Sequence, residues 1–141
     1  MYERSNLARR GGVWPDRAER VEQVKARLRD PDSWLLVAAD GETPVGMACA
    51  EPLRGEDRAG PVVPGGLFLN LIYVLPERWG EAIGGALLDA VLAEAKQRGS
   101  SQIRLWTDED DNERAQRLYL SRGFSHTGRV VDGAGEWALE L

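Results

Sequence analysis

A glycine-rich segment is the first place in the sequence where residue types and spacing point to chemistry. It reads VLPERWGEAIGGALL over residues 74–88, with glycines at positions 80, 84 and 85. Proline interrupts a strand, and the residues after it can begin a helix, whose first amide N–H groups lack partners and carry partial positive charge. Because glycines let another group approach the backbone, the segment predicts a site for a phosphate or pyrophosphate.

Two common nucleotide-binding patterns are absent from this segment. The sequence contains neither GxxxxGK[ST] nor GxGxxG, because its glycines have a different spacing. A glycine-rich turn that only packs closely between a strand and a helix therefore stays open as an alternative.

The elements that must position this segment alternate between helices and strands. Apolar spacings of three and four predict helices over residues 15–30, 81–98 and 112–122, the last two closed by Gly99 and Gly123. Apolar runs predict strands over residues 34–39, 44–50, 67–75, 102–107, 125–131 and 136–141. We expect the first strand to be buried, a hairpin turn at Asp40 and Gly41, and a long loop over residues 54–66.

Composition limits the class of protein further. The 141 residues fit one domain, 1–141, of α/β class, and the net charge of −5 argues against nucleic-acid binding and favours cationic partners. Cys49 has no second cysteine to pair with, and with His126 it cannot form a usual zinc site, so we expect no metal. Without a membrane-length apolar run or a secretion signal, the sequence predicts a cytoplasmic protein that does not bind membranes.

Two ordered motifs resemble the GNAT superfamily of N-acetyltransferases. Motif A of that family is similar to Val74-x-Pro76 followed by Gly80-x-Ala82-Ile83-Gly84 and Leu87-Leu88. Motif B is similar to Asn112-x-x-Ala115-x-x-Leu118-Tyr119 followed by Gly123-Phe124. The resemblance covers residues 34–141 and implies a GNAT-like mixed, mostly antiparallel central sheet flanked by helices, here without the family's first strand.

The resemblance implies a site for acetyl-CoA. Backbone groups of Ile72, Tyr73 and Val74 would hold the pantetheine arm like an added strand. Asn112 maps to a position that contacts this arm, and it is equally a preferred residue to cap the start of its helix. The pyrophosphate would be held by backbone N–H groups of a loop made of Trp79, Gly80, Glu81, Ala82, Ile83, Gly84 and Gly85.

The resemblance also implies direct attack of an amine on the thioester. Tyr119 maps to the general acid that would protonate the leaving thiolate, and its alternative role is that of a core aromatic residue. A backbone N–H near Val74 would hold the oxyanion. For a general base, Glu51 is the best side-chain candidate, with a water chain or an amine of lower pKa as alternatives.

The acceptor is not identified by these residues. A small-molecule amine or a peptide fits, and the acidic balance favours a small cation. Glu81 departs from the family pattern, and we expect it to point outward beside Arg78 and favour the helix N-terminus. Two alternatives remain. The departures at Glu81 and Trp79, together with the absence of an evident general base, suggest a catalytically degenerate CoA-binding sensor or interaction module. The other alternative is an assembly domain without cofactor.

The remaining notable residues have simpler interpretations. The acidic run 108–111 either attracts a cation or forms a solvated loop. We expect a structural role for His126 and core positions for Cys49, Trp34, Trp106 and Trp137. The missing edge strand, together with the habit of the family, favours a homodimer.

Overall fold

The computed structural model describes residues 17–55 and 59–141, so Pro15 and Asp16, predicted at the start of the first helix, lie outside the described residues. The predicted helices and strands are confirmed, with ends that differ by a few residues. Among the described residues, no helix is long and apolar enough to cross a membrane. The elements are α2 (Arg17–Leu28), β1 (Trp34–Asp40), β2 (Thr43–Arg54), β3 (Val62–Val74), the 3-10 helix η2 (Pro76–Arg78), α3 (Ile83–Gln97), β4 (Gln102–Asp108), α4 (Glu113–Ser121), β5 (Ser125–Val131) and β6 (Ala134–Glu140).

The strands form a six-stranded sheet in the order β1-β2-β3-β4-β6-β5. β3 pairs with β4 in parallel, whereas β1 with β2, β4 with β6, and β5 with β6 pair antiparallel. This confirms the predicted mixed, mostly antiparallel sheet. The described residues pack as two compact units, the first made of residues 17–50 and 71–91 and the second of 51–55, 59–70 and 92–141.

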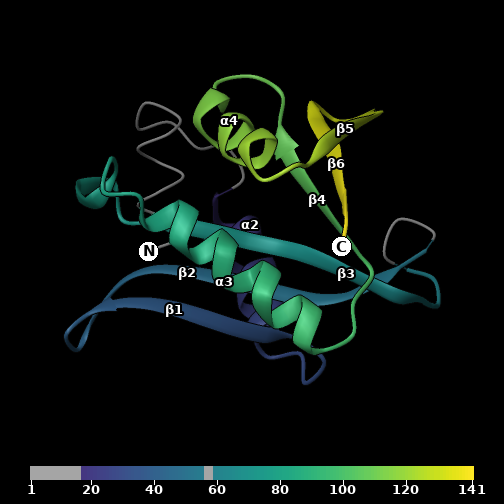
Figure 1. The fold of residues 1–141 in the computed structure, drawn as a ribbon, viewed down its shortest axis with the longest axis horizontal. Coiled ribbons are helices and arrows are strands. Elements are labelled where there is room, and N and C mark those ends of the chain that lie inside the picture. Colours follow the sequence, from purple (N-terminus) through teal and green to yellow (C-terminus); the bar gives the residue numbers. More distant parts are fainter. Residues whose placement is uncertain (1–16, 56–58) are drawn as a thin grey trace. The chain divides into compact units, whose positions relative to one another are not determined.

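In the first unit, helices lie on both faces of β1 and β2. The start of α3 crosses one face and α2 lies on the other (Figure 1). Gly46 faces α3, because a Cβ built there would come 2.9 Å from Leu87 Cδ1. Neighbouring strand residues point to opposite faces, so Met47 and Cys49 lie on the face of α2, where they pack with Leu71.

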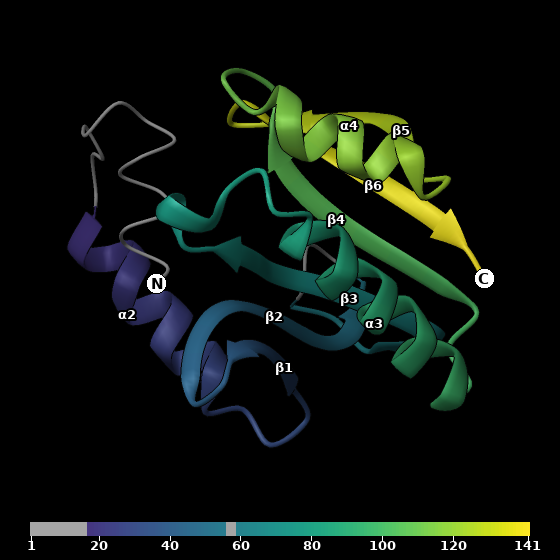
Figure 2. The same cartoon turned by 60° about the vertical axis from the view of Figure 1, so that its left-hand side comes forward.

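In the second unit, α4 lies along β4 and β6 (Figure 2). The Tyr119 ring of α4 lies 6.5 Å from the Trp137 ring of β6, centroid to centroid. Ile103 and Leu105 of β4 are fully buried, as alternating residues on one face of a strand should be. Gly123 ends α4 with φ +91°, a conformation that only glycine adopts readily, and this confirms its predicted role as a cap.

The predicted loop over residues 54–66 is wrong over most of its described length. β2 continues to Arg54 and β3 begins at Val62. Two of the glycines that suggested a loop, Gly65 and Gly66, are strand residues with no room for a side chain. A Cβ on Gly65 would lie 2.5 Å from Ser101 Oγ, and one on Gly66 would lie 2.8 Å from Leu53 Cβ.

The predicted burial of the first strand is also wrong. β1 lies at the end of the sheet order, paired with β2. An edge strand is covered less completely than a central one, and Leu35 and Val37 are about half exposed. Trp34, on the edge strand β1, is half-buried, whereas Trp137, on the inner strand β6, is buried. Trp106 is also half-buried, although its strand β4 is an inner one.

Candidate active site

The strand-to-helix turn of the first unit is held by side-chain and backbone contacts. Trp79 donates its indole N–H to the Val74 carbonyl oxygen at 3.0 Å, which fastens the turn to the last residue of β3. Leu75 donates its backbone N–H to Val45 at 2.9 Å, so the pairing with β2 continues past the strand end. Trp79 therefore supplies a hydrogen bond of its own at a position where the resemblance leads one to expect a polar side chain.

Two residues of this turn have left-handed backbone conformations. Gly80 has φ +89° and Ala82 has φ +62°. Space around Gly80 is open, since a Cβ there would meet no atom within 4 Å. Ala82 is strained, because a residue with a Cβ rarely adopts this conformation.

The bend points the chain into α3. The N–H of Ala86 donates to the Ala82 carbonyl at 3.1 Å, so the amides of Ile83, Gly84 and Gly85 precede the first intrahelical bond, as at any helix start. Three successive amide donors after an open turn form a cradle for an anion. The expectation that Glu81 lies in the helix is corrected, because α3 begins at Ile83.

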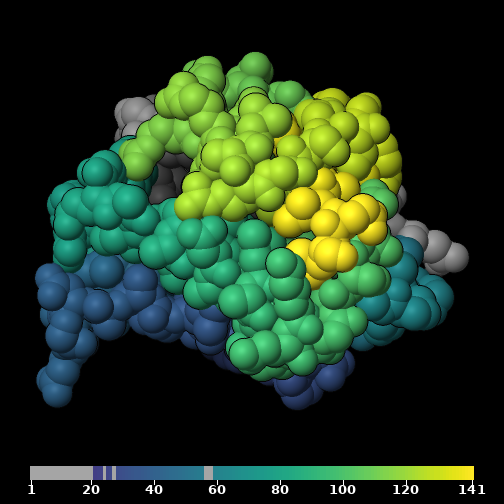
Figure 3. All heavy atoms as spheres, viewed as in Figure 1, coloured from purple at the N-terminus to yellow at the C-terminus, as the bar shows by residue number. Residues whose placement is uncertain are grey.

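Glu81 is instead paired with a cation. Arg78 donates its Nε–H to Glu81 at 2.6 Å and its Nη1–H to Asp40 at 3.3 Å. The turn between β1 and β2, which begins beyond Asp40, lies beside the η2 segment on the face in Figure 3. The hydrogen bond from Arg78 lowers the pKa of Glu81 and raises that of Arg78. Both groups are therefore charged at neutral pH, and the carboxylate beside the cradle is neutralised by its partner.

The second unit holds the other predicted residues, at the junction of β4 and α4. Asn112 precedes α4, but its side chain makes no capping hydrogen bond. Its amide donates instead to Thr107 Oγ1, one strand residue before the end of β4. The predicted capping role of the Asn112 side chain is therefore wrong. Its side-chain amide is directed to the Thr107 hydroxyl and not to the first turn of the helix.

Gln116 is a residue that sequence reasoning missed. Its side-chain amide donates to the carbonyl oxygens of Asp108 and Glu109 at 3.1 and 3.0 Å, which ties the first turn of α4 to the end of β4. Asp111, between them, has φ +55°. Residue spacing alone does not predict such a bond. A glutamine in the first turn of a helix that follows an acidic loop is nevertheless a pattern that could indicate it.

Tyr119 is buried against two aromatic rings. Only 5% of its surface is exposed, and its ring lies 5.7 Å from Phe124 and 6.5 Å from Trp137. The predicted alternative, a core aromatic residue, therefore describes its ring. A phenol that is packed in this way is fixed in direction, which is what a proton donor requires.

His126 belongs to the same aromatic cluster. Its ring lies 5.3 Å from Trp137, its Nε2 contacts Glu109, and its Nδ1 accepts a hydrogen bond from the Gly128 N–H at 2.8 Å. The predicted structural role fits these contacts. One member of the acidic run, Glu109, therefore contacts His126, so the run is not simply a solvated loop.

The predicted site residues fall into two groups. The first unit contains Ile72, Tyr73, Val74 and the loop 79–85. The second contains Asn112 and Tyr119. Glu51 also belongs to the second unit, half-buried inside β2 and not at its end, because that strand is longer than predicted.

Comparison with known proteins identifies the family. The sequence model of the acetyltransferase (GNAT) family matches residues 1–124. An aminoglycoside N(6')-acetyltransferase type 1 of Stenotrophomonas maltophilia is 34% identical over 122 residues, which are 85% of this chain and 78% of that protein.

Solved structures agree on the fold. PaiA N-acetyltransferase from Thermoplasma acidophilum, in complex with coenzyme A, superposes with a TM-score of 0.73 at 15% identity, over 98% of this chain and 87% of that one. An aminoglycoside 6'-N-acetyltransferase complexed with coenzyme A gives 0.70 at 20% identity, over 97% and 88%. The chain therefore belongs to the acetyltransferase (GNAT) family, as its two sequence motifs predict.

Proposed function

We propose that the protein transfers the acetyl group of acetyl-CoA to a primary amine of a small cationic acceptor. Acetyl-CoA as cosubstrate is consistent with the family. A relative that acts on aminoglycosides and the net charge of −5 both favour an acceptor with several amino groups. The cytoplasmic location and the homodimer stay predictions.

The observation that carries this proposal is the strand-to-helix turn of the first unit. It combines the amides at the start of α3, an open approach at Gly80 and a carboxylate, Glu81, that Arg78 neutralises. Such a turn suits the pyrophosphate of CoA. Backbone groups of Ile72, Tyr73 and Val74 are proposed to bind the pantetheine arm.

The chemistry itself needs one proton to be removed and one to be supplied. The amine attacks the thioester carbon, and an N–H near Val74 is proposed to hold the oxyanion. Glu51 is proposed to take the amine proton, directly or through water, and Tyr119 to protonate the CoA thiolate as the C–S bond breaks. Asn112 is proposed to bind the cofactor arm beside its bond to Thr107.

The alternative of an assembly domain without cofactor depends on two departures from the family pattern. Glu81 would have to repel the pyrophosphate, but its charge is offset by Arg78. Trp79 would have to leave the turn without a polar anchor, but its indole N–H supplies one. Both departures are compensated within the same turn, so cofactor binding is favoured, and turnover distinguishes the enzyme from the degenerate CoA-binding module.

Thermal unfolding with and without acetyl-CoA is the first test. Ligand at ~100 times its Kd should stabilise the folded state by about 2.7 kcal/mol, a rise of several degrees in Tm. Desulfo-CoA, which keeps the pyrophosphate but has no thiol, and adenosine, which is the nucleoside alone, serve as control ligands. If the protein is folded and its Tm does not change with acetyl-CoA, the turn does not bind the cofactor and the enzymatic proposal is rejected. If the Tm rises but no amine in a panel is acetylated, the non-catalytic module is favoured.

The Arg78–Glu81 pair gives a sharper prediction for the cofactor. Arg78→Ala should raise the Kd for acetyl-CoA about three- to tenfold, because an unpaired carboxylate then lies beside the cradle. Arg78→Ala combined with Glu81→Ala should restore a Kd close to that of the wild type, measured by isothermal titration calorimetry. Because the pKa of Glu81 is lowered from 4.5, the pair persists at neutral pH and is lost only as the pH falls below that ordinary value. A double variant as weak as Arg78→Ala would show that Arg78 contacts the ligand itself.

A further inference from the structure

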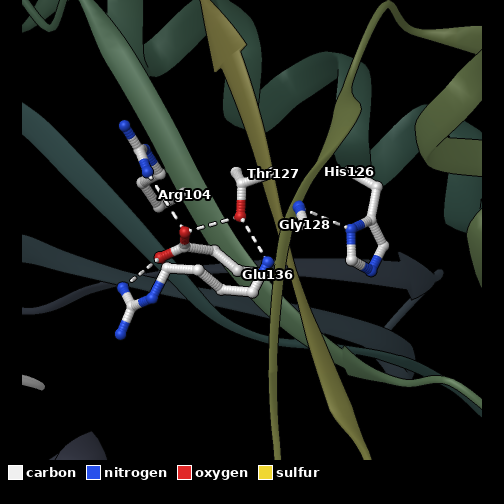
Figure 4. Close-up of polar contacts among 6 residues, drawn as sticks. Arg104, His126, Thr127, Gly128 and Glu136 are labelled. Carbon is white, nitrogen blue, oxygen red and sulfur yellow. Dashed lines mark hydrogen bonds and ion pairs between the residues drawn. The ribbon is translucent and has the colours of Figure 1, made fainter.

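A second cluster of charged side chains lies in the second unit, on the face of β4 and β6 that points away from α4. Trp106 and Glu136 are direct cross-strand partners in the β4–β6 register, so their side chains share one face. Trp137, the next residue along β6, packs on Tyr119 of α4, and neighbouring strand residues alternate. Figure 4 shows Glu136 and Thr127 on the opposite side of β5 from His126.

Glu136 is a buried carboxylate with every oxygen in use. Only 5% of the residue is exposed. Its Oε1 accepts hydrogen bonds from Arg104 at 3.2 Å and from the Thr127 hydroxyl at 2.8 Å (Figure 4). Its Oε2 accepts one from Arg129 at 3.2 Å. The two arginines therefore divide the carboxylate between them, one on each oxygen.

The two arginines differ in how firmly they are placed. The Arg104 side chain, on the central strand β4, is 32% exposed, whereas that of Arg129, on the edge strand β5, is 53% exposed. Every residue of β5 is exposed, and its pairing with β6 is irregular between His126 and Val130. Arg129 is thus a cation on an exposed part of the sheet, and exchange with solvent or ligand costs it little.

The contacts of Arg129 are those of a bound cation. Its guanidinium lies over the Trp106 ring, 5.3 Å from the centroid, while it donates to Glu136 Oε2. An aromatic face with an adjacent carboxylate is a favourable site for an ammonium or guanidinium group. The structure therefore shows a cation site whose occupant is one of the protein's own side chains.

We propose that Trp106 and Glu136 form a subsite for an amino group of a polycationic acceptor, and that Arg129 occupies this subsite until the acceptor displaces it. The inference rests on the proposed function and specifies the acceptor as a molecule with at least two cationic groups, one to be acetylated and one to be held.

Displacement leaves no buried charge without a partner. When an ammonium replaces Arg129 on Oε2, Arg104 and Thr127 remain on Oε1, so the carboxylate stays compensated throughout the exchange. Arg129 moves into water, where its charge is solvated. The step is an exchange of cations on one site, and no covalent bond changes.

The test is the direct binding of kanamycin A, an aminoglycoside with several amino groups, to the whole protein by isothermal titration calorimetry without acetyl-CoA. Arg129→Ala vacates the subsite and should lower the Kd about three- to tenfold, because the ligand no longer competes with an ion pair and a cation–π contact. Trp106→Leu in the Arg129→Ala background should abolish this gain, and Trp106→Phe should keep most of it.

The matched control is Arg98→Ala, which makes the same change in net charge by breaking an exposed ion pair with Glu94 on α3. If long-range attraction alone draws the ligand, Arg98→Ala gains as much as Arg129→Ala, and the subsite is rejected. The subsite is likewise rejected if Arg129→Ala binds kanamycin no more tightly than the wild type, or if neither protein binds it. Thermal unfolding of each variant confirms that it is folded. Glu136 is not substituted, so that every variant keeps this buried carboxylate and the contacts it makes.

Acetyl transfer to kanamycin, measured on the same variants, separates the two proposals. Binding that tightens in Arg129→Ala without any turnover supports the subsite and contradicts the proposed function. Turnover with the same KM for kanamycin in the wild type and in Arg129→Ala supports the proposed function and overturns the subsite.

Discussion

Replacing Tyr119 with phenylalanine should lower kcat for acetyl transfer about 100-fold, with less than a twofold change in the Kd for acetyl-CoA. The substitution removes one hydroxyl and keeps the ring that packs on Phe124 and Trp137. Stability should therefore change little. The loss appears in kcat because the phenol acts only while the thiolate is leaving.

A change of acetyl donor gives this prediction its control. An acetyl thioester whose thiol has a lower pKa needs less help from a proton donor, so Tyr119→Phe should slow its reaction much less. Rapid-quench kinetics must show that chemistry limits the rate with both donors. An equal loss with both donors would make Tyr119 a positioning residue, and an unchanged kcat would leave it with a packing role alone.

Replacing Gly46 with valine should lower the free energy of unfolding by about 1–3 kcal/mol. A Cβ at this position comes 2.9 Å from Leu87 Cδ1 and 3.2 Å from both Ile83 Cγ2 and the Tyr73 carbonyl oxygen. Two of these neighbours belong to the first turns of α3, whose amides form the proposed pyrophosphate site. We therefore expect acetyl-CoA to bind more weakly as well, since α3 must shift to make room.

Gly55→Val is the matched control for this effect. A Cβ on Gly55 meets no atom within 4 Å, whereas a Cβ on Gly46 is in close contact with α3. Urea denaturation of both variants gives the free energies, and calorimetry gives the Kd values. Equal destabilisation of the two variants would mean that the valine acts through the unfolded chain and not through its contact with α3.

The sequence predicted those parts of the fold in which local pattern and tertiary environment agree. Alternation of Ile103, Leu105 and Thr107 marks one face of β4 correctly, and Gly99, with φ +80°, closes α3 as a left-handed cap. In both places the chain needs only its own spacing to specify the element. The order of elements over residues 72–85 could be predicted in the same way, because the end of a strand, a bend and the start of a helix follow one another directly in the sequence.

The errors arise where a distant residue decides the outcome. Gly65 looks like part of a loop until Ser101 is seen to occupy the space of its missing side chain. Leu35 looks buried until β1 proves to be an edge strand. Glu136, which the sequence pattern does not single out, binds two arginines from other strands. No local pattern encodes these pairings, whereas Arg78 and Glu81 stand three residues apart, close enough for a sequence to suggest their bond.

The single cysteine has a practical consequence for the chemistry proposed here. Cys49 is 1% exposed within β2, and the chain contains no other thiol. A disulfide reagent such as Ellman's added to the folded protein therefore meets essentially no protein sulfur, whereas each acetyl transfer releases one CoA thiol. Colour that develops during turnover counts product directly. In the absence of substrates, slow colour reports how often the sheet opens far enough to expose Cys49, so one reagent follows both catalysis and the opening of the native fold.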